Sequence, residues 1–204
     1  MSVLRIGIIS EHHKNDGEPI ATLLQRYFHE KTTLLQRYSR ENVKFEQLCS
    51  RYRSDRLDTK ECFIDLKAQC SAFNPDIIIF VRDLDSERKR ETRATYFEKC
   101  TACAYIKQQI HLLFVYEIEA LILADLDVTT QFYHLKKPLQ LAKSLVKETN
   151  PKGFLKAAIW EATERKMEYS ESDMRELATV LDLELLEKNY PIWSDFIANF
   201  DGIL

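Results

Sequence analysis

Glycine is scarce in this chain: only four of its 204 residues are glycine. The glycine-rich loops that cradle phosphate groups, such as a P-loop or a dinucleotide-binding fingerprint, are therefore excluded. Long apolar runs are also missing, since none approaches the roughly 18 residues that a membrane-spanning helix needs. The N-terminal residues lack the apolar core of a signal peptide. We therefore expect a cytoplasmic protein with no membrane partner.

Neither charge nor cysteine is present in excess. The formal net charge is -3, so bulk charge does not indicate nucleic-acid binding, which would need a local basic patch or a partner. Five cysteines, an odd number in irregular spacing, indicate reduced thiols rather than a disulfide framework. What the chain does have is a hydrophobic content of 45%, which is enough for an ordinary globular core.

The most informative stretch runs from Pro75 to Ser86. Its residues 76–82 are mostly apolar and β-branched, which predicts a buried strand, and Asp83 and Asp85 follow directly. In open α/β sheets, ligands bind beyond the carboxyl ends of the strands, and residues two apart along a strand point to the same side. Two carboxylates directed into one crevice suit a hard divalent cation such as magnesium.

Strands and helices alternate through the first part of the chain. Strands are predicted at 3–9, 42–48, 76–82 and 110–115, with helices at 20–38, 59–73, 92–108 and 116–125. This alternation predicts an α/β fold with a mostly parallel sheet flanked by helices. Beyond residue 127 only helices are predicted, at 129–132, 138–147, 153–163, 172–180, 182–188 and 191–200. We therefore expect an α/β domain over 1–127 and a helical C-terminal subdomain over 128–204.

Acidic residues follow three of the four predicted strands. Glu11 follows the first, Asp83 and Asp85 follow the third, and Glu117 and Glu119 follow the fourth. In a parallel sheet these strand ends lie on one edge, so the carboxylates are expected to converge. Crowded like charges are costly unless a cation neutralises them. Two divalent ions held there could activate water and stabilise the leaving oxygen of a phosphodiester.

This pattern resembles the Toprim domain of topoisomerases, primases and OLD-type nucleases, which places a glutamate after its first strand and Asp-x-Asp after a later one. Further blocks are similar to a small stand-alone Toprim-like family known only as a domain of unknown function. They are Glu-Ile-Glu-Ala-Leu-Ile-Leu-Ala-Asp at 117–125, Pro-Lys-Gly-Phe-Leu at 151–155, and segments at 181–186 and 191–200. The first motif departs from the pattern Glu-Gly-x-(Thr/Ser)-Glu, because the glycine after Glu11 is missing. The second acid would be Asp16 or Glu18.

The resemblance implies a nuclease that depends on Mg²⁺ or Mn²⁺ and cleaves DNA or tRNA. It also implies a partner, an ABC- or OLD-type ATPase of an anti-phage defence system, with a homo-oligomer as a further possibility. The implied catalytic residues are Glu11, Asp83, Asp85, Glu119 and Lys152, and the implied metal ligands are Glu11, Asp83, Asp85, Glu117 and Glu119. Lys166 is the other candidate for the basic residue.

Two other functions fit parts of the pattern. A non-catalytic subunit that binds such an ATPase fits the acidic net charge and the helical final third. A haloacid-dehalogenase-like phosphatase also uses a strand-ending Asp-x-Asp, but it places that motif on its first strand. His12 and His13 lie in the loop after the first predicted strand, so we expect them to face solvent or a substrate phosphate. Asp125 is expected to cap a helix.

Overall fold

The computed structural model describes residues 3–30, 42–84, 108–141, 145 and 148–204. Its centre is a sheet of four parallel strands in the order β2-β1-β3-β4. The strands are β1 (Leu4–Ser10), β2 (Val43–Gln47), β3 (Ile77–Leu84) and β4 (Gln108–Val115). The predicted α/β fold with a parallel sheet flanked by helices is confirmed, and each of the four strands begins within two residues of its predicted start.

Strand β3 is central and buried on both faces, as its nearly continuous apolar sequence requires. Ile79 and Val81 face one hydrophobic cluster, whereas Ile78 and Phe80 face the other. The strand is longer than predicted, because Asp83 is paired in register with Phe114 of β4. Asp83 is therefore held by the sheet itself and does not lie in the loop beyond it.

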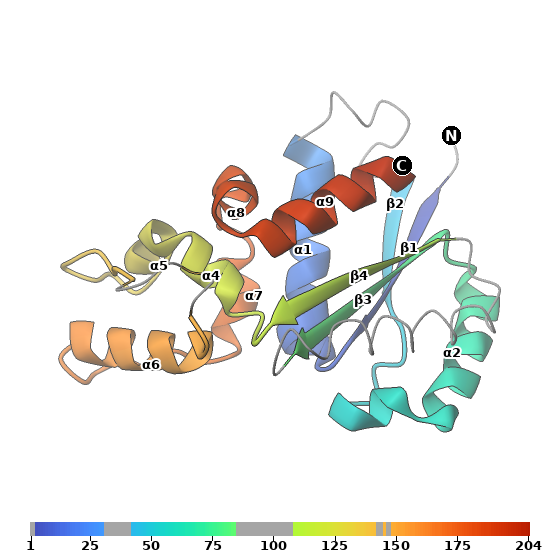
Figure 1. Cartoon of the computed structure of the whole chain (residues 1–204), viewed down its shortest axis with the longest axis horizontal. Helices are drawn as coiled ribbons and strands as arrows, with labels where there is room; N and C mark the ends of the chain where they lie inside the picture. The colour runs from blue at the N-terminus through green and yellow to red at the C-terminus, as the bar shows by residue number, and fades with distance from the viewer. Residues whose placement is uncertain (1–2, 31–41, 85–107, 142–144, 146–147) are drawn as a thin grey trace.

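Helices cover both faces of this sheet (Figure 1). Helices α1 (Glu18–Glu30) and α9 (Pro191–Ile203) supply residues to one cluster, and α2 (Lys60–Phe73) supplies residues to the other. Helix α2 has clear end signals. The Thr59 side chain accepts a hydrogen bond from the Cys62 N–H at its start, and Asn74 adopts the left-handed conformation at its end.

The remaining helices lie beyond the carboxyl ends of β3 and β4, or pack back onto the sheet (Figure 1). They are α4 (Ala120–Ala124), α5 (Leu126–Phe132), α6 (Pro151–Ala162), α7 (Asp173–Leu177) and α8 (Leu183–Asn189). Two short helices precede α1 and α2, namely η1 (His13–Gly17) and η3 (Ser54–Asp58). In the described part of the chain, none of the helices combines the length and the apolarity that crossing a membrane would take.

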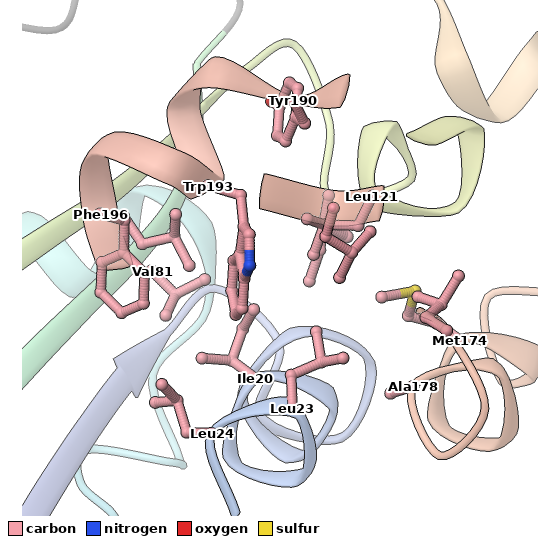
Figure 2. Packing of buried hydrophobic residues seen from close by; sticks show 14 of the residues in the cluster. Ile20, Leu23, Leu24, Val81, Leu121, Met174, Ala178, Tyr190, Trp193 and Phe196 are labelled. Carbon is pink, nitrogen blue, oxygen red and sulfur yellow. The ribbon is translucent and has the colours of Figure 1, made fainter. Parts of the chain in front are cut away.

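One hydrophobic core joins the two predicted domains. Trp193 points from α9 toward Ile20 of α1, with Phe196 and Val81 on one side and Leu121 on the other (Figure 2). Trp193 is fully buried. The boundary at residue 127 stays a prediction, but α9 shares the core of the sheet.

Two predicted helices differ from the structure, and two extend beyond its described part. The helix predicted at 116–125 forms only as α4, because the Tyr116 N–H bonds Leu84 O and the residue then takes a positive φ of 80°. The helix predicted at 138–147 is wrong for Pro138–Leu141, where the N–H of Leu139 bonds the Thr130 hydroxyl instead. The helix predicted at 92–108 lies outside the described residues except for its last residue, which belongs to β4, and the one at 20–38 is described only to residue 30.

Candidate acidic site at the carboxyl edge of the sheet

Four segments bring carboxyl groups to one edge of the sheet. Glu11 follows β1, Asp16 lies in η1, Asp83 lies in β3, and Glu117 and Glu119 lie between β4 and α4. Burial raises the pKa of Asp83 well above its usual range, and the charges of the other four carboxylates raise it further. The charges of the predicted residues Glu11, Glu117 and Glu119 therefore all act on Asp83. Asp85, also predicted for this site, lies outside the described residues.

Asp16 is one of the two acids that could complete the first motif. It is buried in η1, a single π-helical turn of a kind often found at functional sites, and it accepts a hydrogen bond from the His12 N–H at 2.8 Å. Burial raises the pKa of Asp16 to about 7, and the charges of Glu11 and Glu119 contribute. Glu18 turns away toward Arg175, 3.3 Å from its guanidinium. Of the two acids that the sequence left open, Asp16 joins the cluster.

Close packing fixes this turn. A methyl group added at Gly17 would overlap the side-chain amide of Gln47. We expect Gly17→Ala to lower the free energy of unfolding by about 1 kcal/mol, the low end of the usual cost of overpacking, because the atoms that the methyl group meets are the end of the flexible Gln47 side chain. The matched control is Gly202→Ala in α9, where a methyl group would meet no atom within 4 Å. Urea denaturation of both variants measures the difference, and equal stability would show that the turn can move aside.

A buried arginine holds Glu11 in place. Arg82 of β3 is 1% exposed, and its Nε donates to Oε1 of Glu11 at 2.7 Å. Its two terminal nitrogens donate to Oδ1 and Oδ2 of Asp58 at 3.0 and 3.4 Å. Because side chains alternate along a strand, Arg82 lies on the α2 face and Asp83 on the opposite face. Arg82 and Asp58 were not predicted as site residues, although a single arginine at the end of an apolar strand is a signal that the sequence contains.

Lys152 supplies a positive charge to the site. It lies in the first turn of α6, and its Nζ is 3.7 Å from Oε1 of Glu119 and 3.9 Å from Oε1 of Glu117. Its backbone N–H also donates to Oε2 of Glu117 at 2.9 Å. Burial alone would lower the pKa of Lys152, but Glu119, Glu171 and Glu117 together raise it. The other candidate, Lys166, is largely exposed and lies 3.5 Å from Glu164.

Glu119 is the most enclosed carboxylate of the site, at 2% exposure. Its Oε1 accepts a hydrogen bond from the Tyr169 hydroxyl at 3.2 Å. Its Oε2 is buried and has no hydrogen-bond partner among the residues that the structure describes. Burial raises the pKa of Glu119, whereas the charge of Lys152 opposes that rise. A buried polar atom without a partner costs about 1–3 kcal/mol, and a bound cation would remove that cost.

The donor set fits a hard divalent cation in its chemistry, because Mg²⁺ and Mn²⁺ prefer carboxylate oxygens. The side chains are not arranged around one point, however. Within the described ranges, no three Asp, Glu, His or Cys side chains are grouped so that they could hold a metal ion. Arg82 engages Glu11, and Lys152 lies beside Glu117 and Glu119. Binding an ion would therefore require some of these side chains to move.

Comparison of the chain with protein-family models, with curated proteins and with solved structures finds no match. The likeness to Toprim proteins thus stays a prediction that depends on the motifs.

Asp125 bonds to the starts of two helices rather than to the residues of the acidic site. Its Oδ1 accepts a hydrogen bond from the Val128 N–H at 3.2 Å, at the start of α5, and its Oδ2 accepts one from the Asp182 N–H at 2.9 Å. The predicted capping role of Asp125 is confirmed. It serves two helix starts, because Asp182 is itself the cap of α8.

Proposed function

We propose that this chain hydrolyses phosphodiester bonds of nucleic acid with the help of Mg²⁺ or Mn²⁺. The observation that carries the proposal is the environment of Asp83. This residue is fixed in strand β3 by its pairing with β4. Its pKa is raised by burial and by the negative charges of four other carboxylates, those of Asp16, Glu119, Glu11 and Glu117. Such crowding destabilises a fold unless a cation compensates for it, so it is typical of a binding site rather than of a structural core.

Each residue has a role in this proposal. Asp83, Asp16 and Glu119 would hold the ion, and Glu11, Glu117 and Asp85 are further candidate ligands. The chemistry that a bound divalent cation supplies is the activation of water and the stabilisation of charge on phosphate oxygens. Lys152 would bind an anionic oxygen of the substrate through its ammonium group. Arg82 would keep the carboxylate of Glu11 oriented without touching the substrate.

The test uses purified chain stripped of metal and then supplied with Mn²⁺ or Mg²⁺, on DNA and on tRNA. We expect cleavage with metal, no cleavage with chelator, and a loss of more than about a hundredfold in Glu119→Gln, because even residues that only support a metal ligand typically contribute 10- to 100-fold. Glu168→Gln is the matched control, since Glu168 is exposed and lies 3.9 Å from Lys156. Full activity of Glu119→Gln would contradict the proposal.

The Toprim resemblance supports a wider proposal, in which the chain is the effector subunit of a defence system controlled by an ABC- or OLD-type ATPase. Co-purification with such an ATPase, followed by the same cleavage assay on the complex, tests this part. The complex is also the right sample if the chain alone is inactive.

One observation favours a second function, that of a non-catalytic subunit of the same assembly. Arg82 and Lys152 already neutralise part of the acidic cluster without any ion. Calorimetric titration with Mn²⁺ separates the two functions, because a purely structural cluster would bind no ion. The phosphatase alternative has no such support, since Asp83 lies on the third strand along the chain.

A further inference from the structure

The carboxylate of Glu171 joins two sides of the acidic site. Its Oε1 is 3.0 Å from Nζ of Lys152 in α6, and its Oε2 accepts a hydrogen bond from Nδ2 of Asn15 in η1 at 2.9 Å. Glu171 belongs to the segment between α6 and α7, and it is 156 residues from Asn15 in sequence. Each oxygen of one carboxylate thus has its own donor, from a different part of the fold.

The surroundings of Glu171 stabilise a negative charge. The hydrogen bond from Lys152 lowers the pKa of Glu171, burial opposes that shift, and the hydrogen bond from Asn15 lowers the pKa further. His12 lies beside Asn15, because its Nδ1 accepts a hydrogen bond from the Asn15 N–H at 3.2 Å. An ammonium and a side-chain amide therefore face one anion.

These donors are of the kind that bind the non-bridging oxygens of a phosphate group. The Glu171 side chain is 48% exposed, so an ion from solution can reach the place that it occupies. The same Lys152 ammonium is 3.7 Å from Glu119, which puts these donors directly beside the carboxylates of the acidic site. A phosphate held here would lie next to the acidic site.

We propose that Lys152 and Asn15 form a phosphate-binding subsite, and that the carboxylate of Glu171 occupies it until a phosphate group of the substrate displaces it. The inference rests on the proposed function for the identity of the substrate, a polynucleotide phosphodiester. It adds two things to that function: the residues that bind the phosphate, and an internal anion that competes with it.

The test measures binding of inorganic phosphate by calorimetry, in chelator and at constant ionic strength. We expect Glu171→Ala to bind phosphate about tenfold more tightly than the wild type, the gain expected if Glu171 occupies the subsite about nine-tenths of the time. The matched control is Glu168→Ala, which removes the same charge from the same segment and should bind like the wild type. A fluorescein-labelled single-stranded oligonucleotide, followed by anisotropy in chelator, should show the same order of affinities.

The gain should depend on the donors. In the double variant Lys152→Ala/Glu171→Ala, we expect the added affinity to disappear. If Glu171→Ala unfolds the chain, as judged by circular dichroism, Glu171→Gln replaces it, because it removes the charge at nearly constant volume. Phosphate affinity that does not rise when Glu171 loses its charge would overturn the inference and leave an ordinary surface ion pair.

The two proposals fail in different ways. Metal-dependent cleavage together with unchanged phosphate affinity in Glu171→Ala refutes the subsite and leaves the nuclease. A tenfold gain in phosphate affinity, in a chain that binds no Mn²⁺ and cleaves neither DNA nor tRNA, refutes the nuclease and leaves an anion-binding site.

Discussion

Asp83→Asn is expected to abolish metal-dependent cleavage, by more than about a hundredfold, and at the same time to stabilise the metal-free protein. The carboxylate of Asp83 is desolvated and repelled by the other carboxylates of the site. An amide of nearly the same size removes that repulsion but is a poorer ligand for a divalent ion. The melting temperature in chelator and the rate of cleavage are measured on the same variant. If the first rises while the second is lost, Asp83 contributes to function and lowers stability.

The same pair of proteins tests the ion directly. Mn²⁺ should raise the melting temperature of the wild type in proportion to its binding, and it should have little effect on Asp83→Asn. Asp127→Asn is the matched control, since Asp127 is exposed in the first turn of α5; it should leave metal response and cleavage unchanged and lower stability by less than about 1 kcal/mol. A wild type whose melting temperature does not respond to Mn²⁺, Mg²⁺ or Ca²⁺ would count against a metal site at this edge of the sheet.

Arg82→Met is expected to lower the free energy of unfolding by about 2–3 kcal/mol. Methionine fills much of the volume of arginine but leaves Glu11 and Asp58 without the guanidinium. Removing one partner of a fully buried ion pair costs about 3–5 kcal/mol. The cost is lower here because the side chains of Glu11 and Asp58 are 22% and 31% exposed, so that water can solvate part of the charge.

An exposed arginine provides the comparison for Arg82. Arg51 lies 2.7 Å from Asp65, but its side chain is 68% exposed. Arg51→Met should therefore cost less than about 1 kcal/mol, as is usual for surface ion pairs. Urea denaturation of the two variants measures the difference. In Arg82→Met, Glu11 should also lose its fixed orientation, so kcat should fall more than KM rises, and equal stability of the two variants would contradict the role given to Arg82.

The sheet was predictable because each strand has its own local signal. Short β-branched runs such as residues 77–79 favour a buried strand over a helix, and their alternation with helical segments indicates a parallel sheet. The placement of Glu11, Asp83 and Glu119 at one edge of the sheet followed from this, since parallel strands end at one edge. Helix ends were harder to predict. The N–H of Leu139 bonds a hydroxyl nine residues away, and no local pattern indicates that contact.

The rest of the site depends on contacts between distant parts of the chain. Lys152 was predicted only through a resemblance, and its position beside Glu119 follows from how α6 packs. Glu171 carries no signal in the sequence, since it is one of many exposed acids in a polar segment. Asp16 could not be separated from Glu18 without the π-helical turn, which turns one of them inward and the other toward α7.

Several hydrogen bonds join residues that are more than 150 positions apart in the sequence. Asn15 meets Glu171 across 156 positions, Arg26 meets Leu181 across 155, and the Tyr27 hydroxyl meets Asp201 across 174. Contacts of such high sequence separation give a high contact order, so much of the loop-closure entropy must be lost before they form, and folding is correspondingly slow. Lys152, which lies beside Glu119, and Glu171, which contacts Asn15, both come after residue 150 and are absent from a chain whose α6–α9 region has yet to be synthesised. A ribosome-bound nascent chain of this protein would therefore expose the carboxylates that precede α6 before the ammonium that neutralises part of their charge is available.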